Sequence, residues 1–258
     1  MKIQEAVQRI IYPNPEDPEL INAIQEIREA YSFFALKCVN ENGDSVFCAI
    51  NHCLHGYDED GHNALGCHLE TESMYILRFL DNAKYVNDHF EFFRLYMVQL
   101  YLFTEKLLEI TKIVGLPETY RQKNLPVFGE IKTWTNFLKH PKAFILTHHP
   151  KYLFESQTLL VDKARKNHKN KILDFAFIKK YYSGEDKKDN ANLVSLLANK
   201  PNIVLVLPDM LRLTNEFVAS AETVMNLIAK NPTFQEILTS ESTLKQYYSE
   251  DIKGARTI

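Results

Sequence analysis

The sequence predicts a mainly α protein, a multi-helix bundle with a small two- or three-stranded β element in its C-terminal half. Only 8 Gly and 10 Pro interrupt 258 residues, which favours long helices over a turn-rich β sandwich or barrel. Apolar residues recur at helical spacing along much of the chain. A hydrophobic content of 45% supplies enough apolar surface for a large core.

The longest expected helix spans residues 87–114, with Asn87 or Asp88 as its N-cap and Gly115 at its end. Thr71 is the candidate N-cap of the helix before it, over residues 70–80. The other main helices are expected at residues 18–37, 130–140, 209–230 and 232–248. Apolar runs at residues 144–148, 172–178 and 202–208 predict the strands of the β element.

Three regions are expected along the chain. Residues 1–69 hold N-terminal helices and a Cys/His-rich loop, residues 70–150 form a helical core, and residues 151–258 form a helical region with short strands. We expect the last region to pack on the core as one unit.

The helix at residues 90–113 is unusually apolar. Its polar residues fall on a narrow stripe made of Glu91, Arg94, Glu105, Glu109 and Lys112. This is too little polar surface for an ordinary exposed helix. We therefore expect a homodimer, or an obligate hetero-complex with a protein partner, that buries part of this helix.

Charge and hydropathy limit the classes of partner and compartment. A formal net charge of -3 gives no overall attraction to nucleic acid, so RNA or nucleotide binding would need a local basic patch. The N-terminus shows no secretory signal, and no run of apolar residues is long enough to span a membrane. We expect a cytoplasmic protein without a membrane partner.

A Cys/His-rich segment between residues 48 and 68 raises the question of zinc. Cys53, His55, Cys67 and His68 could converge on a tetrahedral ion, but no C-x2-C pair is present. We expect no metal and no cofactor, with these Cys packing as small apolar groups. A zinc-stapled all-α interaction protein stays as an alternative.

The helix at residues 130–140 holds the best candidate site. Ile131, Trp134 and Leu138 share one stripe, whereas Lys132, Asn136 and His140 share another. Pro141 is expected to end the helix at His140, beside carbonyl groups that have no partner within the helix. An imidazole titrates near neutral pH, so His140 is the candidate proton shuttle and Asn136 an orienting group.

Basic residues near this helix predict phosphate binding. Lys139 adjoins His140 in the candidate catalytic group. The candidate phosphate- or RNA-binding residues are cationic or titratable side chains along residues 121–149: Arg121, Lys123, Lys132, His148 and His149. RNA cleavage without a metal ion requires a base and a cation, and these residues supply both.

The order of a long apolar helix, a basic connector and a helix ending in Asn-x3-His resembles the HEPN superfamily over residues 70–150. That superfamily has Arg, often followed by Asn, and then His four to six positions later. Here Asn136 and His140 match, and Thr135 stands in place of the Arg. The resemblance implies an up-down helical core in which two copies face one cleft. It also implies a role in prokaryotic toxin or antiviral defence systems.

Three function classes follow. The first is a HEPN-like endoribonuclease that acts through Asn136 and His140 without metal. The second is a catalytically silent HEPN-like module that binds RNA, a nucleotide or a partner protein as a scaffold. The third is the zinc-stapled interaction protein. The chain has none of the G-x4-GK[ST], G-x-G-x-x-G, H-E-x-x-H or G-x-S-x-G motifs that would indicate other enzymes.

Overall fold

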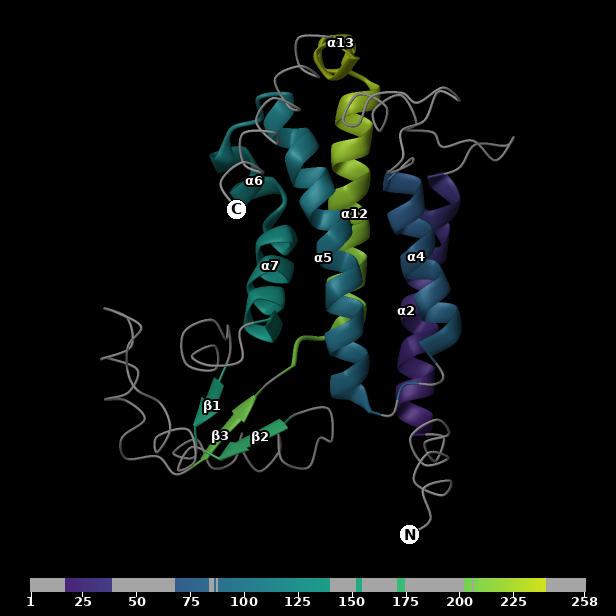
Figure 1. The fold of residues 1–258 in the computed structure, drawn as a ribbon, viewed down its shortest axis with the longest axis vertical. Coiled ribbons are helices and arrows are strands. Elements are labelled where there is room, and N and C mark those ends of the chain that lie inside the picture. Colours follow the sequence, from purple (N-terminus) through teal and green to yellow (C-terminus); the bar gives the residue numbers. More distant parts are fainter. Residues whose placement is uncertain are drawn as a thin grey trace, which may run out of the picture. The chain divides into compact units, whose positions relative to one another are not determined.

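The computed structural model describes residues 17–38, 68–83, 86, 88–139, 152–154, 171–174, 202–205 and 207–239. The described helices, in chain order, are α2 (Pro18–Lys37), α4 (His68–Asn82), α5 (His89–Ile113), α6 (Glu118–Asn124), α7 (Pro126–Lys139), α12 (Met210–Ala229) and α13 (Pro232–Thr239) (Figure 1). The described strands are β1 (Tyr152–Phe154), β2 (Lys171–Asp174) and β3 (Asn202–Leu205). None of the described helices combines the length and the apolar character that a membrane span requires.

The chain divides into two compact units. The first contains residues 1–22, 83–98 and 130–210, and the second contains residues 23–82, 99–129 and 211–258. The long helices α2, α5 and α7 each contribute residues to both units.

The core of the second unit is a cluster of aromatic rings. Phe34 of α2 contacts the rings of Phe103 of α5 and Phe217 of α12, with centroid separations of 5.8 and 6.3 Å. Phe217 also contacts Phe103 at 5.6 Å and Phe128 at 6.0 Å. All of these side chains are buried. Rings from α2, α5, α7 and α12 therefore meet at one point, and their burial is a major source of stability.

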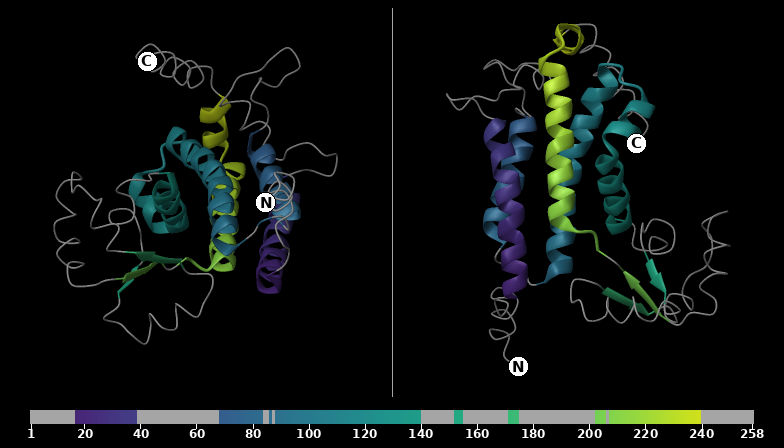
Figure 2. Two further views of the ribbon diagram at one scale, coloured as in Figure 1. Left: turned by 60° about the horizontal axis from the view of Figure 1, so that its bottom comes forward. Right: turned by 180° about the vertical axis from the view of Figure 1, so that it is seen from behind.

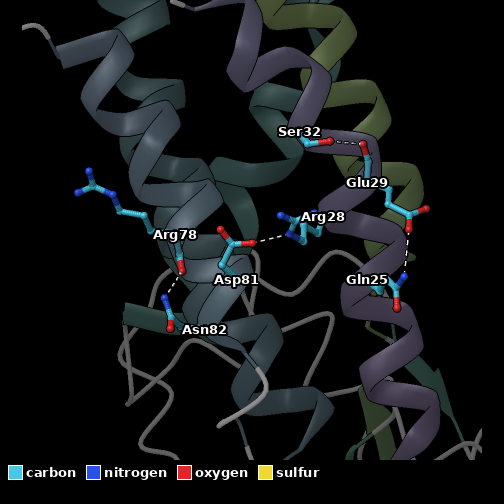
Figure 3. Close-up of polar contacts among 7 residues, drawn as sticks. All are labelled: Gln25, Arg28, Glu29, Ser32, Arg78, Asp81 and Asn82. Atoms are coloured by element: carbon cyan, nitrogen blue, oxygen red, sulfur yellow. Dashed lines mark hydrogen bonds and ion pairs between the residues drawn. The ribbon is translucent and has the colours of Figure 1, made fainter. Parts of the chain in front are cut away.

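Helices α2 and α4 run side by side within the second unit (Figures 1 and 2). The buried Tyr31 hydroxyl donates a hydrogen bond to Ser73 Oγ at 3.1 Å. At the exposed edge, Arg28 pairs with Asp81 (Figure 3). A buried hydrogen bond and a surface ion pair thus link the same two helices.

The first unit has its own aromatic contacts. The ring of Trp134 on α7 lies edge-on to Phe93 on α5, with centroids 5.0 Å apart and planes at 85°. On α5, the rings of Phe92 and Tyr96 stack at 5.5 Å. These four side chains are buried. The sequence prediction that Ile131 and Trp134 face a core is confirmed, since Ile131 is also buried.

The long helix predicted at residues 87–114 is confirmed, and each end of α5 lies within two residues of the predicted end. Asp88 Oδ1 accepts hydrogen bonds from the backbone N–H groups of Phe90 and Glu91, both at 2.8 Å. Asp88 is therefore the N-cap. At the other end, the N–H of Gly115 donates to Lys112 O and the N–H of Leu116 donates to Thr111 O, each at 2.9 Å. With Gly115 at φ 75°, this is a Schellman ending.

Two other helix starts differ from the sequence predictions. Helix α4 begins at His68, so Thr71 lies inside its first turn and is not an N-cap, and the helix continues to Asn82. Helix α7 begins at Pro126, four positions before the expected start. Proline is favoured in the first turn because its missing N–H has no partner there in any case. Local apolar periodicity locates helices but not their ends.

The β part of the predicted fold class is wrong. Wherever the structure describes side-chain burial, every element is a helix, so the described core is all helical and no β layer contributes to it. The expected strand at residues 144–148 lies outside the described residues. Helix was expected from residue 153 onward, yet β1 occupies Tyr152–Phe154.

The strands that the backbone does contain are short pairings in the order β1-β3-β2, with Leu153 and Ile172 both opposite Val204. Each strand has three or four residues. A typical strand has about five or six. Short apolar runs do not decide between a strand and a helix, which explains why helix was expected where β1 lies.

Two glycines give a test of the helix ends. We expect Gly115→Ala to destabilise the protein by about 1–2 kcal/mol, because φ is positive there although an added Cβ would meet no atom within 4 Å. Gly129→Ala, inside α7 and equally open, should stabilise it by about 0.5–1 kcal/mol. Urea unfolding of both variants measures the difference. A Gly115→Ala variant as stable as the wild type would contradict the Schellman ending.

Candidate functional site

Helix α7 positions the residues of the predicted motif. It begins at Pro126 and ends at Lys139, one residue before His140. Trp134 and Ile131 are 1% and 0% exposed, so these two side chains fix the rotation of the helix about its axis. Each following residue then advances by about 100° around the helix.

Thr135 lies inside the core. Its side chain is 4% exposed, and its Oγ1 donates to the backbone oxygen of Ile131 at 2.9 Å. The oxygen of Met97 on α5 lies 3.5 Å from the same hydroxyl. A threonine hydroxyl that bonds the carbonyl four residues earlier satisfies itself without solvent. The position that holds Arg in the HEPN motif is therefore a packing position here.

Asn136 and Lys132 occupy the other side of α7. Asn136 is half-buried and Lys132 is exposed, and their spacing of four residues places them one turn apart. Leu138, expected on the packing stripe, is only half-buried. His140 and the side chain of Lys139 lie outside the described residues. The described part of the predicted catalytic group is thus an amide, with a lysine one turn away.

The remaining predicted phosphate ligands are spread over the chain. Arg121 and Lys123 lie on the short helix α6, which belongs to the second unit, whereas Lys132 and Asn136 belong to the first. Lys123 is exposed and Arg121 half-buried. Arg121 Nη1 is buried without a hydrogen-bond partner among the described residues. His148 and His149 lie outside those residues.

The described residues contain no group of three potential metal ligands. Cys53, His55 and Cys67 lie outside them, and His68 is the first residue of α4. Cys38 is fully buried, and burial raises the pKa of its thiol to about 11, against a smaller lowering by the Ser73 hydroxyl. A thiol that stays protonated at neutral pH is a poor nucleophile and a poor metal ligand.

One partly buried ion pair was not anticipated from the sequence. Lys106 Nζ of α5 lies 2.6 Å from Glu72 Oε1 of α4. Glu72 is 8% exposed, and its Oε2 has no hydrogen-bond partner within the described part of the chain. Burying a carboxylate with one free oxygen costs stability unless its pairing offsets the lost hydration.

Two exposed large apolar side chains of α2 were also missed. Phe33 and Leu36 of α2 are 75% and 70% exposed. On α5, Leu95, Val98 and Leu102 are each about two-fifths exposed and recur at heptad spacing between the polar residues. The signal was present in the sequence. Phe33 and Leu36 fall off the stripe that contains Tyr31 and Phe34.

Comparisons with known proteins add no relative. No protein-family model matches the chain, and no curated protein or solved structure matches it.

The burial of Thr135 can be tested with a matched pair of variants. We expect Thr135→Arg to cost about 3–5 kcal/mol of stability, because it places an unpaired charge in the core. Asn136→Arg, at the half-buried neighbouring position, should cost less than about 1 kcal/mol. Thermal and urea unfolding measure both. If Arg were tolerated equally at the two positions, residue 135 could reach solvent and could support the HEPN arginine.

Proposed function

We propose that the chain is a catalytically silent helical module that binds a partner protein. The observation that carries this proposal is the packing of Thr135 against the oxygen atoms of Ile131 and Met97. The resemblance to HEPN proteins supports the same conclusion, because inactive members of that superfamily serve as binding or scaffold modules.

The chemistry of RNA cleavage argues against an active site on α7. Attack by a ribose 2′-hydroxyl needs a base for its proton and a cation that stabilises the developing charge on phosphate. Thr135 supplies neither. Asn136 orients but does not transfer protons, and Lys132 cannot grip phosphate in the bidentate way that Arg does.

The exposed surface supports protein binding. Phe33 and Leu36, three residues apart on α2, are the most exposed large apolar side chains among the described residues. Large apolar side chains grouped on a surface mark interaction sites. A net charge of -3 supplies no general attraction to RNA. A protein partner, either another copy or a different chain, therefore fits better than nucleic acid.

A direct test compares the wild type with His140→Ala on single-stranded and hairpin RNA, with and without a chelator. We expect no cleavage above background by either protein, because no described group replaces the missing cation. Light scattering of the same samples should show a mass above the 30.0 kDa of one chain, alone or with a co-expressed partner.

Lys112→Ala, at an exposed position of α5 outside the candidate site, is the control for a nonspecific loss of positive charge. RNA cleavage by the wild type that disappears in His140→Ala, at an unchanged melting temperature, would contradict the proposal and restore the ribonuclease. A chain that stays monomeric with every co-expressed candidate partner would contradict the binding role.

A further inference from the structure

The outward face of α2 combines two carboxylates with two large apolar side chains. Glu26, Glu29, Phe33 and Leu36 follow one another at spacings of three, four and three residues, and all four are exposed. This spacing keeps them on one stripe along about 15 Å of helix. We call these four residues the α2 face.

The packing of α2 sets this face away from its own unit. Tyr31 and Phe34 point into the core, and Phe33 lies between them in sequence but about 100° or more around the helix. In Figure 3, Arg28 reaches towards Asp81 of α4, whereas Glu29 and Gln25 lie on another flank of α2 and hydrogen-bond each other at 3.1 Å. The contact with α4 thus uses a different side of α2.

The charge of the α2 face is negative. No cation in the described part of the chain forms an ion pair with Glu26 or Glu29. Lys37, at the end of the same face, is already held by Glu222 Oε1 of α12 at 2.6 Å. The face therefore offers uncompensated carboxylates beside apolar surface.

This combination selects among occupants. Membrane surfaces rich in anionic lipid and the phosphates of nucleic acid would both be repelled by Glu26 and Glu29. A second copy would present the same carboxylates on its own α2. A chain with Lys or Arg next to large apolar residues is complementary both to the negative charge and to the apolar surface of the α2 face. The spacing of three, four and three residues along the α2 face suits a partner helix that lies along α2 and packs its side chains between those of the face.

We propose that the α2 face binds an amphipathic helix of another protein, whose basic residues lie opposite Glu26 and Glu29 and whose apolar residues cover Phe33 and Leu36. This inference rests on the proposed protein-binding function and names the chemistry of the partner. It makes α2, which contains no residue of the HEPN-like motif, the docking element.

A pair of synthetic helical peptides serves as the probe. Both carry the same Leu stripe, and one has Lys where its twin has Glu. Fluorescence anisotropy with the full-length chain should show the Lys peptide binding at least about tenfold more tightly than the Glu peptide, with the difference shrinking as salt rises. The double variant Phe33→Ser/Leu36→Ser should weaken binding of the Lys peptide by about tenfold or more.

Charge reversal provides the sharpest arm of this experiment. The double variant Glu26→Lys/Glu29→Lys should lose the Lys peptide and gain the Glu peptide. Glu118→Lys on α6 is the matched control, because Glu118 also hydrogen-bonds a glutamine four residues away at 3.1 Å. Leu102→Ser is the control for loss of an exposed apolar side chain. Both controls should bind the Lys peptide as the wild type does.

Several results would overturn the docking proposal. One is equal binding of the two peptides, and another is binding of anionic vesicles or RNA that Glu26→Lys/Glu29→Lys does not strengthen. A third is a large fall in the melting temperature of Phe33→Ser/Leu36→Ser, which would mean that the chain covers this face itself. RNA cleavage that requires His140, together with peptide discrimination, would sink the proposed silent function and leave the docking face standing.

Discussion

The contact between Phe34 and Phe217 constrains most of the second unit. Phe217 also touches Phe103 and Phe128, so one ring of α12 contacts side chains of three other helices. Each such pair contributes roughly 0.5–1.5 kcal/mol beyond the burial of its area. Its geometric effect is as important. Once Phe34 is fixed in the core, the rotation of α2 is fixed, and Phe33 must lie outside.

The contact between Trp134 and Phe93 plays the same part in the first unit. It fixes α7 so that Thr135 stays within the core and Asn136 reaches only partway to solvent. The HEPN motif, which residues 135–140 resemble, has Arg at the first of these neighbouring positions and often Asn at the second. In this chain the rotation of α7 buries the first of these positions, Thr135, in the core. The packing that stabilises the fold therefore also buries position 135, and the Thr at that position supplies no cation to the candidate site.

Much of the helical architecture could be predicted from the sequence. The N-cap at Asp88, the ending at Gly115 and the inward stripe of Ile131 and Trp134 depend on local chemistry and on the helical repeat, which a single sequence shows. The β part of the fold class was predicted wrongly, although the apolar runs at residues 172–178 and 202–208 overlap strands β2 and β3. Period counting can locate a short extended run, but it does not show that the run adds no layer to an all-helical core.

The candidate site was less accessible to sequence reasoning. Thr135 is a short polar residue on a helix, and nothing local reveals that its hydroxyl bonds Ile131 O and that α5 packs over it. The pairing of Glu72 with Lys106 likewise depends on two helices meeting. Tertiary packing decides both of these cases. The exposure of Phe33, by contrast, could have been predicted, because Phe33 falls off the stripe that contains Tyr31 and Phe34.

The central claim is that the chain acts through protein contacts and not through chemistry on α7. Photo-crosslinking in living cells tests it most directly, with benzoylphenylalanine placed either at position 33 or at position 136. We expect the α2 position to crosslink to protein and the α7 position to yield no crosslinked RNA. RNA crosslinked at position 136, with no protein crosslinked at position 33, would contradict this account.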